Sequence, residues 1–180
     1  MTLTLLWRYT LTMNPEAAQD FINACVDGNL PAVKRFLTEG FAVDTANKVN
    51  FTPLMAAARS YRVDVVAFLL ESGADIHRSD IYGNTPLHVA VGEASTTPEK
   101  QAECVHLILK RGAVVDAQDQ SGCTPLMSAA WFGCLPAVHH LLGRGASVRL
   151  RDQQGRTAED LARARSHPEI VELLATHASR

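Results

Sequence analysis

Histidine and cysteine are the residues of this sequence best suited to acid–base, nucleophilic or metal chemistry. The chain contains 7 His and 4 Cys, yet it has no Cys-x-x-Cys pair and no histidine at zinc-ligand spacing from a cysteine. His139 and His140 are adjacent, so on a helix they would point to different faces, as a packing residue and a surface residue do. The sequence also lacks a Gly-x-Gly-x-x-Gly motif and a phosphate-binding loop. We therefore expect a protein that is not an enzyme and that has no metal site and no cofactor.

Composition and charge argue against two further classes of protein, those that bind nucleic acid and those that span membranes. Of the 180 residues, 47% are hydrophobic and 20% are charged, as in ordinary folded proteins. Lys and Arg number 17 against 19 Asp and Glu, which gives a net charge of −2. Proteins that mainly bind nucleic-acid phosphates are usually strongly basic, so we do not expect a nucleic-acid partner. No apolar run reaches the ~18 residues of a membrane-spanning helix, so we expect no membrane association.

The N-terminal segment does not resemble a secretory signal. Arg8 interrupts its apolar stretch, and no small-residue cleavage site follows. We interpret residues 1–13 as an extension that is disordered or that precedes a natural start at Met13. The four cysteines fit reduced, mostly packed thiols, so we expect a cytoplasmic location.

Three independent markers recur along the chain with the same spacing. A Thr-Pro-Leu motif begins at Thr52, Thr85 and Thr124, with a degraded copy at Thr157. A glycine near the end of each unit recurs with the same spacing. An acidic or amide residue, three positions before a Gly or Asn, recurs with that spacing too. Steps of 33, 39 and 33 residues separate the successive copies. The glycines are Gly40, Gly73, Gly112 and Gly145, and the third marker is Asn47, Asp80, Asp119 and Asp152.

These motifs resemble the ankyrin repeat, which has a period of about 33 residues and a Thr-Pro-Leu-His signature. The likeness covers residues 14–180, nearly the whole chain. It implies an all-α fold, a solenoid of stacked antiparallel helix pairs with β-hairpin or loop fingers, in one continuous domain. The five repeats, of which the first and last are caps, are expected at 14–46, 47–79, 80–118, 119–151 and 152–180.

Local rules explain the residues of each repeat. Gly122 supplies the positive φ of a tight turn, and Asn50 takes the same place in repeat two because asparagine tolerates that conformation next best. Threonine then caps a helix and proline occupies its first turn. One helix pair cannot bury its apolar face alone, so stability must come from contact between neighbouring repeats.

Two departures from the pattern stand out. Repeat three carries six extra residues within 92–100, where Thr97 and Pro98 predict the start of a longer second helix. We interpret this insertion as a tolerated surface loop in preference to a dedicated contact loop. Tyr61 occupies a place where Gly28 and Gly133 occur in other repeats, which indicates a local change of that turn.

The resemblance also assigns roles to two reactive side chains. His88 fills the histidine position of the signature, where ankyrin repeats use the imidazole for structural hydrogen bonds. Because Met55 and Met127 fill that position in other copies, we interpret His88 as structural and not as a general base. Cys123 lies on a predicted finger with no His or Lys placed beside it, which favours a plain surface thiol over a redox sensor.

Ankyrin arrays generally bind proteins through the fingertips and the inward face of the first helices, and the resemblance implies the same here. Several of these variable positions hold apolar or aromatic residues that the core does not need, and such residues often anchor protein interfaces. Tyr82 and Trp131 are the strongest candidates, whereas packing onto the neighbouring repeat is the alternative for Trp131 and Phe132. The expected partner-binding residues are Lys48, Phe51, Arg59, Ile81, Tyr82, Asn84, Gln120, Cys123, Trp131, Phe132, Arg156 and Arg165. Val49, Ser121, Gln153 and Gln154 are further fingertip positions, and Ser60 is a further inner-helix position.

Positive charge is concentrated near the C-terminus. Six arginines lie from Arg144 to Arg165, against three acidic residues. This excess predicts either a partner with an acidic segment or the solvated surface of a terminal cap.

The sequence as a whole predicts a monomeric, non-enzymatic protein that binds a protein partner as an inhibitor, adaptor or neutraliser. Two alternatives stay open. One is a secreted, host-directed effector, and the other is a stress or redox accessory protein that uses Cys123.

Overall fold

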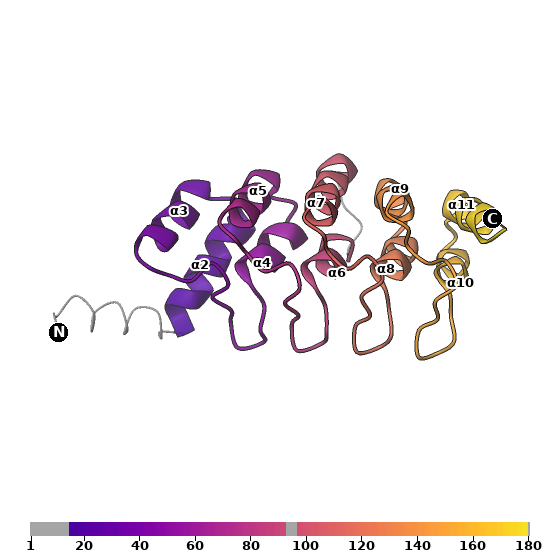
Figure 1. Ribbon diagram of the computed structural model, residues 1–180, viewed down its shortest axis with the longest axis horizontal. Helices are drawn as coiled ribbons and strands as arrows, with labels where there is room; N and C mark the ends of the chain where they lie inside the picture. Colours follow the sequence, from indigo (N-terminus) through magenta and orange to yellow (C-terminus); the bar gives the residue numbers. More distant parts are fainter. Residues whose placement is uncertain (1–14, 93–96, 180) are drawn as a thin grey trace.

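Helix pairs follow one another in a single elongated row, as the computed structural model shows for residues 15–92 and 97–179 (Figure 1). The first helices of the pairs form an inner row beside the projecting loops, and the second helices form an outer row above them. The inner helices are α2 (Pro15–Asp27), α4 (Pro53–Arg59), α6 (Pro86–Ala90), α8 (Pro125–Phe132) and α10 (Ala158–Ala164). The outer helices are α3 (Leu30–Thr38), α5 (Val63–Glu71), α7 (Pro98–Lys110), α9 (Leu135–Gly143) and α11 (Pro168–Ala178).

This architecture confirms the predicted all-α solenoid of stacked helix pairs. The described residues contain no β-strand, so the fingers that precede α4, α6, α8 and α10 are loops. Each helix pair lies within one of the expected repeat ranges. The expected extension at residues 1–13 lies outside the described residues.

Threonine caps fix the starts of the inner helices. The hydroxyl of Thr52 accepts the N–H of Met55 at 3.2 Å, and that of Thr124 accepts the N–H of Met127 at 3.3 Å. Both threonines are fully buried, so each cap satisfies a backbone donor that water could not reach. A proline follows each cap within the first turn, where its missing N–H leaves no bond unmade.

The turn between the paired helices requires a left-handed residue, which explains Tyr61. Gly28 and Gly133 have φ values of 73° and 75° in this turn, and Tyr61 has a φ of 54° at the same place. A residue with a Cβ adopts this conformation at a cost of roughly 1–2 kcal/mol. Tyr61 therefore keeps the backbone path of the repeats that have glycine here. The change of this turn that the sequence suggested is not found.

The core runs through the whole array instead of filling one centre. Small side chains at equivalent positions of the inner helices allow the helices of neighbouring repeats to approach closely. These positions are fully buried in four consecutive repeats, at Ala57, Ala90, Ala129 and Ala162.

One backbone hydrogen bond closes the turn in repeats one, two, four and five. The N–H that precedes the outer helix donates to a carbonyl near the end of the inner helix. These bonds join Asn29 to Ala24 at 2.9 Å, Arg62 to Ala57 at 2.9 Å, Cys134 to Ala129 at 3.0 Å and His167 to Ala162 at 3.0 Å.

In repeat three, a side chain donates the hydrogen bond to the carbonyl near the end of the inner helix. Gln101 is at the position of Arg62 and Cys134, but here the backbone N–H donates to the carbonyl of Thr97 as part of the longer helix α7. The Nε2 of Gln101 donates to the Ala90 carbonyl at 3.1 Å instead, and its Oε1 accepts the Cys134 thiol at 3.0 Å. Gln101 is 1% exposed. A buried amide thus replaces the backbone donor that the insertion displaces.

The insertion itself lengthens the outer helix. Helix α7 has 13 residues where α5 and α9 have 9, and it begins at Pro98 after Thr97 as predicted. Residues 93–96 lie outside the described part of the chain.

His88 connects repeats three and four, as its predicted structural role requires. The N–H of Thr85 donates to Nδ1 at 3.2 Å, so Nε2 carries the proton and donates to the carbonyl of Cys123 at 3.1 Å. His88 is 3% exposed. Burial lowers the pKa of His88, although the bond to Cys123 and the charge of Asp119 oppose the shift.

We predict that Gln101→Leu destabilises the protein by about 1–3 kcal/mol, because the buried Ala90 carbonyl and the Cys134 thiol both lose their partner. Urea unfolding followed by circular dichroism measures the change. Gln118→Leu is the matched control, because its exposed amide donates to the Gly122 carbonyl and its loss should cost about 0.5 kcal/mol or less. Equal effects of the two substitutions would show that Gln101 does not close the turn.

The pH dependence of stability should report on His88. A lowered folded-state pKa means that the unfolded chain takes up this proton first, so His88 should stabilise the fold fully above pH ~6.5 and progressively less as the pH falls. His88→Met, which introduces the residue found in repeats two and four, should lower the free energy of unfolding by about 1 kcal/mol at pH 7.5. Its free energy of unfolding should then fall less steeply than that of the wild type down to pH ~5.5. Parallel pH profiles for the two proteins would contradict this.

Candidate functional site

Carboxylate and amide oxygens hold each finger rigid. Oδ1 of Asp80 accepts the N–H groups of Tyr82 and Asn84, both at 2.9 Å, which fixes the loop around the tip. Asn47, Asp119 and Asp152 make the same pair of bonds in the other fingers. The third sequence marker is therefore the residue that folds the finger.

Backbone bonds also join each finger to the one before it. The N–H of Ile81 donates to the Val49 carbonyl at 3.1 Å, and that of Gln120 donates to the Tyr82 carbonyl at 2.9 Å. The Gln120 side chain adds a second bond, from Nε2 to the Ile81 carbonyl at 2.8 Å. Gln153 repeats both contacts toward the finger of Gln120. The fingers thus form one connected row along the lower edge of the array (Figure 1).

Large apolar side chains are exposed at the tips of two adjacent fingers. Val49 is 37% exposed, Ile81 is 42% exposed and Tyr82 is 61% exposed, and we call these three residues the fingertip patch. Val114, at 57%, is comparably exposed but lies between α7 and the next finger. The structure therefore brings the predicted Ile81 and Tyr82 together with Val49.

Two arginines lie on aromatic rings along the inner helices. The guanidinium carbon of Arg59 is 5.5 Å from the centre of the Phe51 ring, and that of Arg165 is 3.8 Å from the Trp131 ring. By the repeat spacing, Trp131 takes in repeat four the place that Arg59 takes in repeat two. We call Arg59, Trp131 and Arg165 the inner strip.

Trp131 and Phe132 are both half-buried. Trp131 packs against the hydrophobic core while Arg165 covers part of its ring. Trp131 thus contributes to packing, the alternative that the sequence left open, and it also orients an exposed arginine.

Other predicted site residues have different surroundings. Lys48 and Gln120 are exposed. Asn84 and Arg156 instead support their own fingers, since Nδ2 of Asn84 donates to Asp80 at 3.2 Å and Nη2 of Arg156 lies 2.7 Å from Oδ2 of Asp152. Hydrogen bonds from Arg156 hold the pKa of Asp152 below its usual range despite burial.

Cys123 is the most accessible of the four cysteines, but it is half-buried and unpaired. Its Sγ lies 3.6 Å from the Ser128 hydroxyl and 3.7 Å from the Thr124 carbonyl. Burial raises the pKa of the Cys123 thiol, and it raises the pKa values of Cys25 and Cys104 to about 12. These surroundings favour the unreactive thiol form.

The C-terminal arginine cluster is mostly used within the protein. Five of the six arginines bind acceptors of the chain itself: Arg144 binds the Leu109 carbonyl, Arg149 that of Ala178, Arg151 that of Gly155, Arg156 the Asp152 carboxylate and Arg163 that of Glu159. Arg165 is the sixth, and among the described residues no carboxylate lies within 4 Å of it. Arg144, Arg149 and Arg151 keep their positive charge because carbonyls are neutral, whereas Arg156 and Arg163 are paired with carboxylates.

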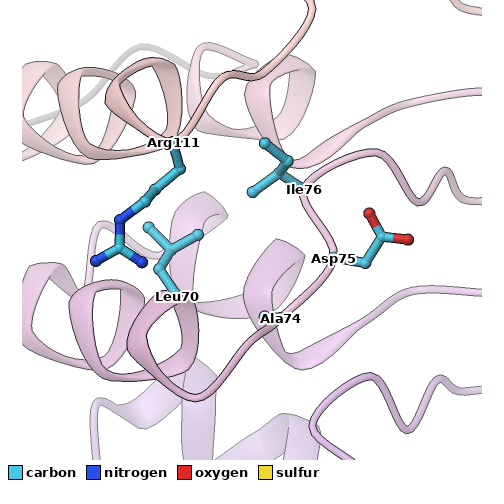
Figure 2. Close-up of a pocket in the computed structure, with 5 residues that line it drawn as sticks. All are labelled: Leu70, Ala74, Asp75, Ile76 and Arg111. Carbon is cyan, nitrogen blue, oxygen red and sulfur yellow. The ribbon is translucent and has the colours of Figure 1, made fainter.

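One cavity of the described residues lies away from the fingers and the inner strip. Shown in Figure 2, it is open, has a volume of about 270 Å³ and lies between the outer parts of repeats two and three. Its charged residues are Asp75, directed away from the cavity, and Arg111, beside Leu70. Oδ1 of Asp75 already accepts the His77 N–H at 2.8 Å.

The histidines of the outer helices form a small group. His106 on α7 and His140 on α9 have ring centres 5.4 Å apart, and His139 is exposed beside them. Burial lowers the pKa of His140, which favours its neutral form. Over residues 15–92 and 97–179, no group of three or more His, Cys, Asp or Glu side chains is arranged to hold a metal ion. In the same part of the chain, no helix combines the length and apolar character needed to cross a membrane.

Known proteins share this repeat pattern. A family model of ankyrin repeats (3 copies) matches residues 21–119 and 94–180. "Ankyrin repeat, SAM and basic leucine zipper domain-containing protein 1" of Atelerix albiventris is 32% identical over 115 residues, 64% of this chain and 24% of the relative. The Mus musculus protein of that name is 31% identical over 117 residues, with the same coverage of 64% and 24%. "Neurogenic locus notch homolog protein 4" of Homo sapiens is 40% identical over 96 residues, 52% of this chain and 4% of the relative.

The matches define the family and not a complete counterpart. The chain spans 24% or less of the length of these curated relatives. Ankyrin repeats form a non-enzymatic fold that serves as a protein–protein interaction module. From the recurring motifs, the stacked helix pairs and the family match over residues 21–180, this chain belongs to the ankyrin repeat family.

Proposed function

We propose that this chain binds a protein partner through the fingertip patch and the inner strip, and that it inhibits, links or neutralises the partner by occupying it. The observation that carries this proposal is the exposure of Tyr82, 61%, at the tip of a finger whose backbone is bonded on both sides. Aromatic residues and arginines are the commonest anchors of protein interfaces.

The fingers are already ordered, which lowers the free-energy cost of binding a partner. Binding costs free energy for every side chain and loop that must be ordered. Here Asp80 fixes the loop and the Gln120 N–H fixes the Tyr82 carbonyl before any partner arrives. A contact made by Ile81 and Tyr82 would therefore lose little affinity to loop ordering.

We also propose that the protein is a cytoplasmic monomer. All four cysteines are unpaired, which fits a reducing compartment. The last inner helix carries an ion pair between Glu159 and Arg163, on the positions where other inner helices bury apolar residues against the next repeat. A charged end of this kind disfavours further stacking of copies.

Site-specific photo-crosslinking tests the binding surface directly. With a photoreactive phenylalanine in place of Tyr82, irradiation in the source cells should yield one dominant adduct that mass spectrometry identifies as a protein partner. The same group in place of Val114 is the matched control, since Val114 is 57% exposed but lies outside the fingertip patch, before the turn that begins at Asp119. Adducts at both positions, or at neither, would count against the fingertip patch.

The redox alternative makes a separate prediction for Cys123. Because burial raises its thiol pKa, Cys123 should react with a disulfide reagent at pH ~8 more slowly than free cysteine, although faster than the three buried cysteines. Absorbance kinetics of thiol labelling measure this, and Cys123→Ser should remove only the first phase. In urea all four thiols should react at the rate of free cysteine. If Cys123 reacted with the reagent faster than free cysteine does, the result would support the redox role instead.

A further inference from the structure

We infer that the partner presents an extended, acidic segment to the inner strip, with carboxylates received by Arg59 and Arg165 and apolar side chains between them. This inference rests on the proposed function and specifies the chemistry of the partner. It comes from the charge state, the spacing and the surroundings of these two arginines.

Arg59 and Arg165 are oriented but not neutralised. Each guanidinium lies on an aromatic ring, at 5.5 Å from the centre of Phe51 and 3.8 Å from that of Trp131. Among the described residues, no carboxylate lies within 4 Å of either side chain. A guanidinium stacked on a ring keeps its N–H groups at its edge, where they can bind a carboxylate through two parallel bonds.

The nearby carboxylates do not compete for these arginines. Asp80, Asp119 and Asp152 each accept two backbone N–H groups of their own finger. Lys48, at the tip of the first finger, is exposed and adds a third positive charge. Lys48, Arg59 and Arg165 therefore give this face three positive charges with no described carboxylate within 4 Å, beside the negative charges that Asp80 and Asp119 keep.

Spacing sets the length of the segment. Arg59 ends α4 and Arg165 follows α10, so α6 and α8 lie between them along the array (Figure 1). Because the Arg165 guanidinium lies on Trp131 of α8, the two guanidinium groups are two to three helix steps of about 8–10 Å apart, a span of roughly 16–30 Å. An extended chain advances about 3.3 Å per residue, so its two acidic residues should be about five to nine positions apart.

The surface between the arginines suits apolar side chains. Gly92 takes the Arg59 position in repeat three and has no side chain, and Trp131 in repeat four is half-buried. Ile81 and Tyr82 add exposed apolar surface at a fingertip. Asp27, exposed in repeat one, would repel an acidic run continuing beyond Arg59. This favours a short acidic segment over a long polyanion.

Selection from a phage-displayed library of random twelve-residue peptides tests the inference. Peptides enriched by the wild-type protein should contain more Asp and Glu than the library, spaced about five to nine positions apart. The variant with Arg59→Gln and Arg165→Gln should enrich no such excess. Lys110→Gln with Arg111→Gln removes the same charge from the end of the outer helix α7 and should select like the wild type. Circular dichroism and urea midpoints check that both variants fold.

Fluorescence anisotropy with one selected peptide then measures each contact. Each arginine substitution should weaken binding about tenfold at low salt. Replacing the facing Glu of the peptide with Gln should weaken binding to the wild type similarly, and should add little loss once that arginine is gone. The wild-type affinity should fall as the salt concentration rises.

Several outcomes would overturn the inference. These are a selection that enriches no peptide, enriched peptides without acidic excess, or an equal loss in the control with Lys110 and Arg111 replaced. Binding of a ten-nucleotide single-stranded RNA that depends on Arg59 and Arg165 would assign the face to nucleic acid instead. A specific adduct at Tyr82 alongside any of these failures would leave the proposed protein binding intact and remove only the acidic segment.

Discussion

Contact between the inner helices of neighbouring repeats is the constraint on which the rest of the structure depends. Ala57, Ala90, Ala129 and Ala162 are fully buried where one inner helix meets the next, so no repeat can bury its apolar surface without its neighbour. This close approach fixes the distance between successive turns and fingers. The side chains that cross from one repeat to the next, such as those of Arg62 and His167, reach carbonyls of the preceding turn because that distance is constant.

Structural and binding tasks are divided between residues of the same finger. Asp80 folds the loop and Gln120 connects it to the next finger, while Tyr82 contributes only its backbone to these bonds. The Tyr82 ring is therefore free to vary without loss of the fold. This division explains why the site could not be read from charge alone: Arg156 and Asn84 occupy variable positions, but the structure uses both to hold a finger.

Much of the fold could be predicted from the sequence because the determinants are local. Threonine caps, the left-handed residue Asn50 and the marker Asp119 each act within five residues of their own position, and all three recur at the repeat spacing. The roles of Gln101 and of the C-terminal arginines depend on partners in other segments, so spacing in the sequence gives no signal for them. Arg144, for example, binds a carbonyl 35 residues away. For Tyr61, the glycines at the equivalent positions of repeats one and four could have indicated that this position needs a left-handed backbone.

Gln101 influences the proposed binding face because it holds the turn of repeat three against that of repeat four. An insertion that shifted repeat three relative to repeat four would change the distance between Arg59 and Arg165, because every later repeat would move with it. By donating to the Ala90 carbonyl and accepting the Cys134 thiol, the Gln101 amide keeps the turn of repeat three in contact with that of repeat four. The added length appears in the described residues as the longer outer helix α7, which begins at Pro98. The two arginines can thus act as a pair at a fixed separation although the insertion lies between them in the chain.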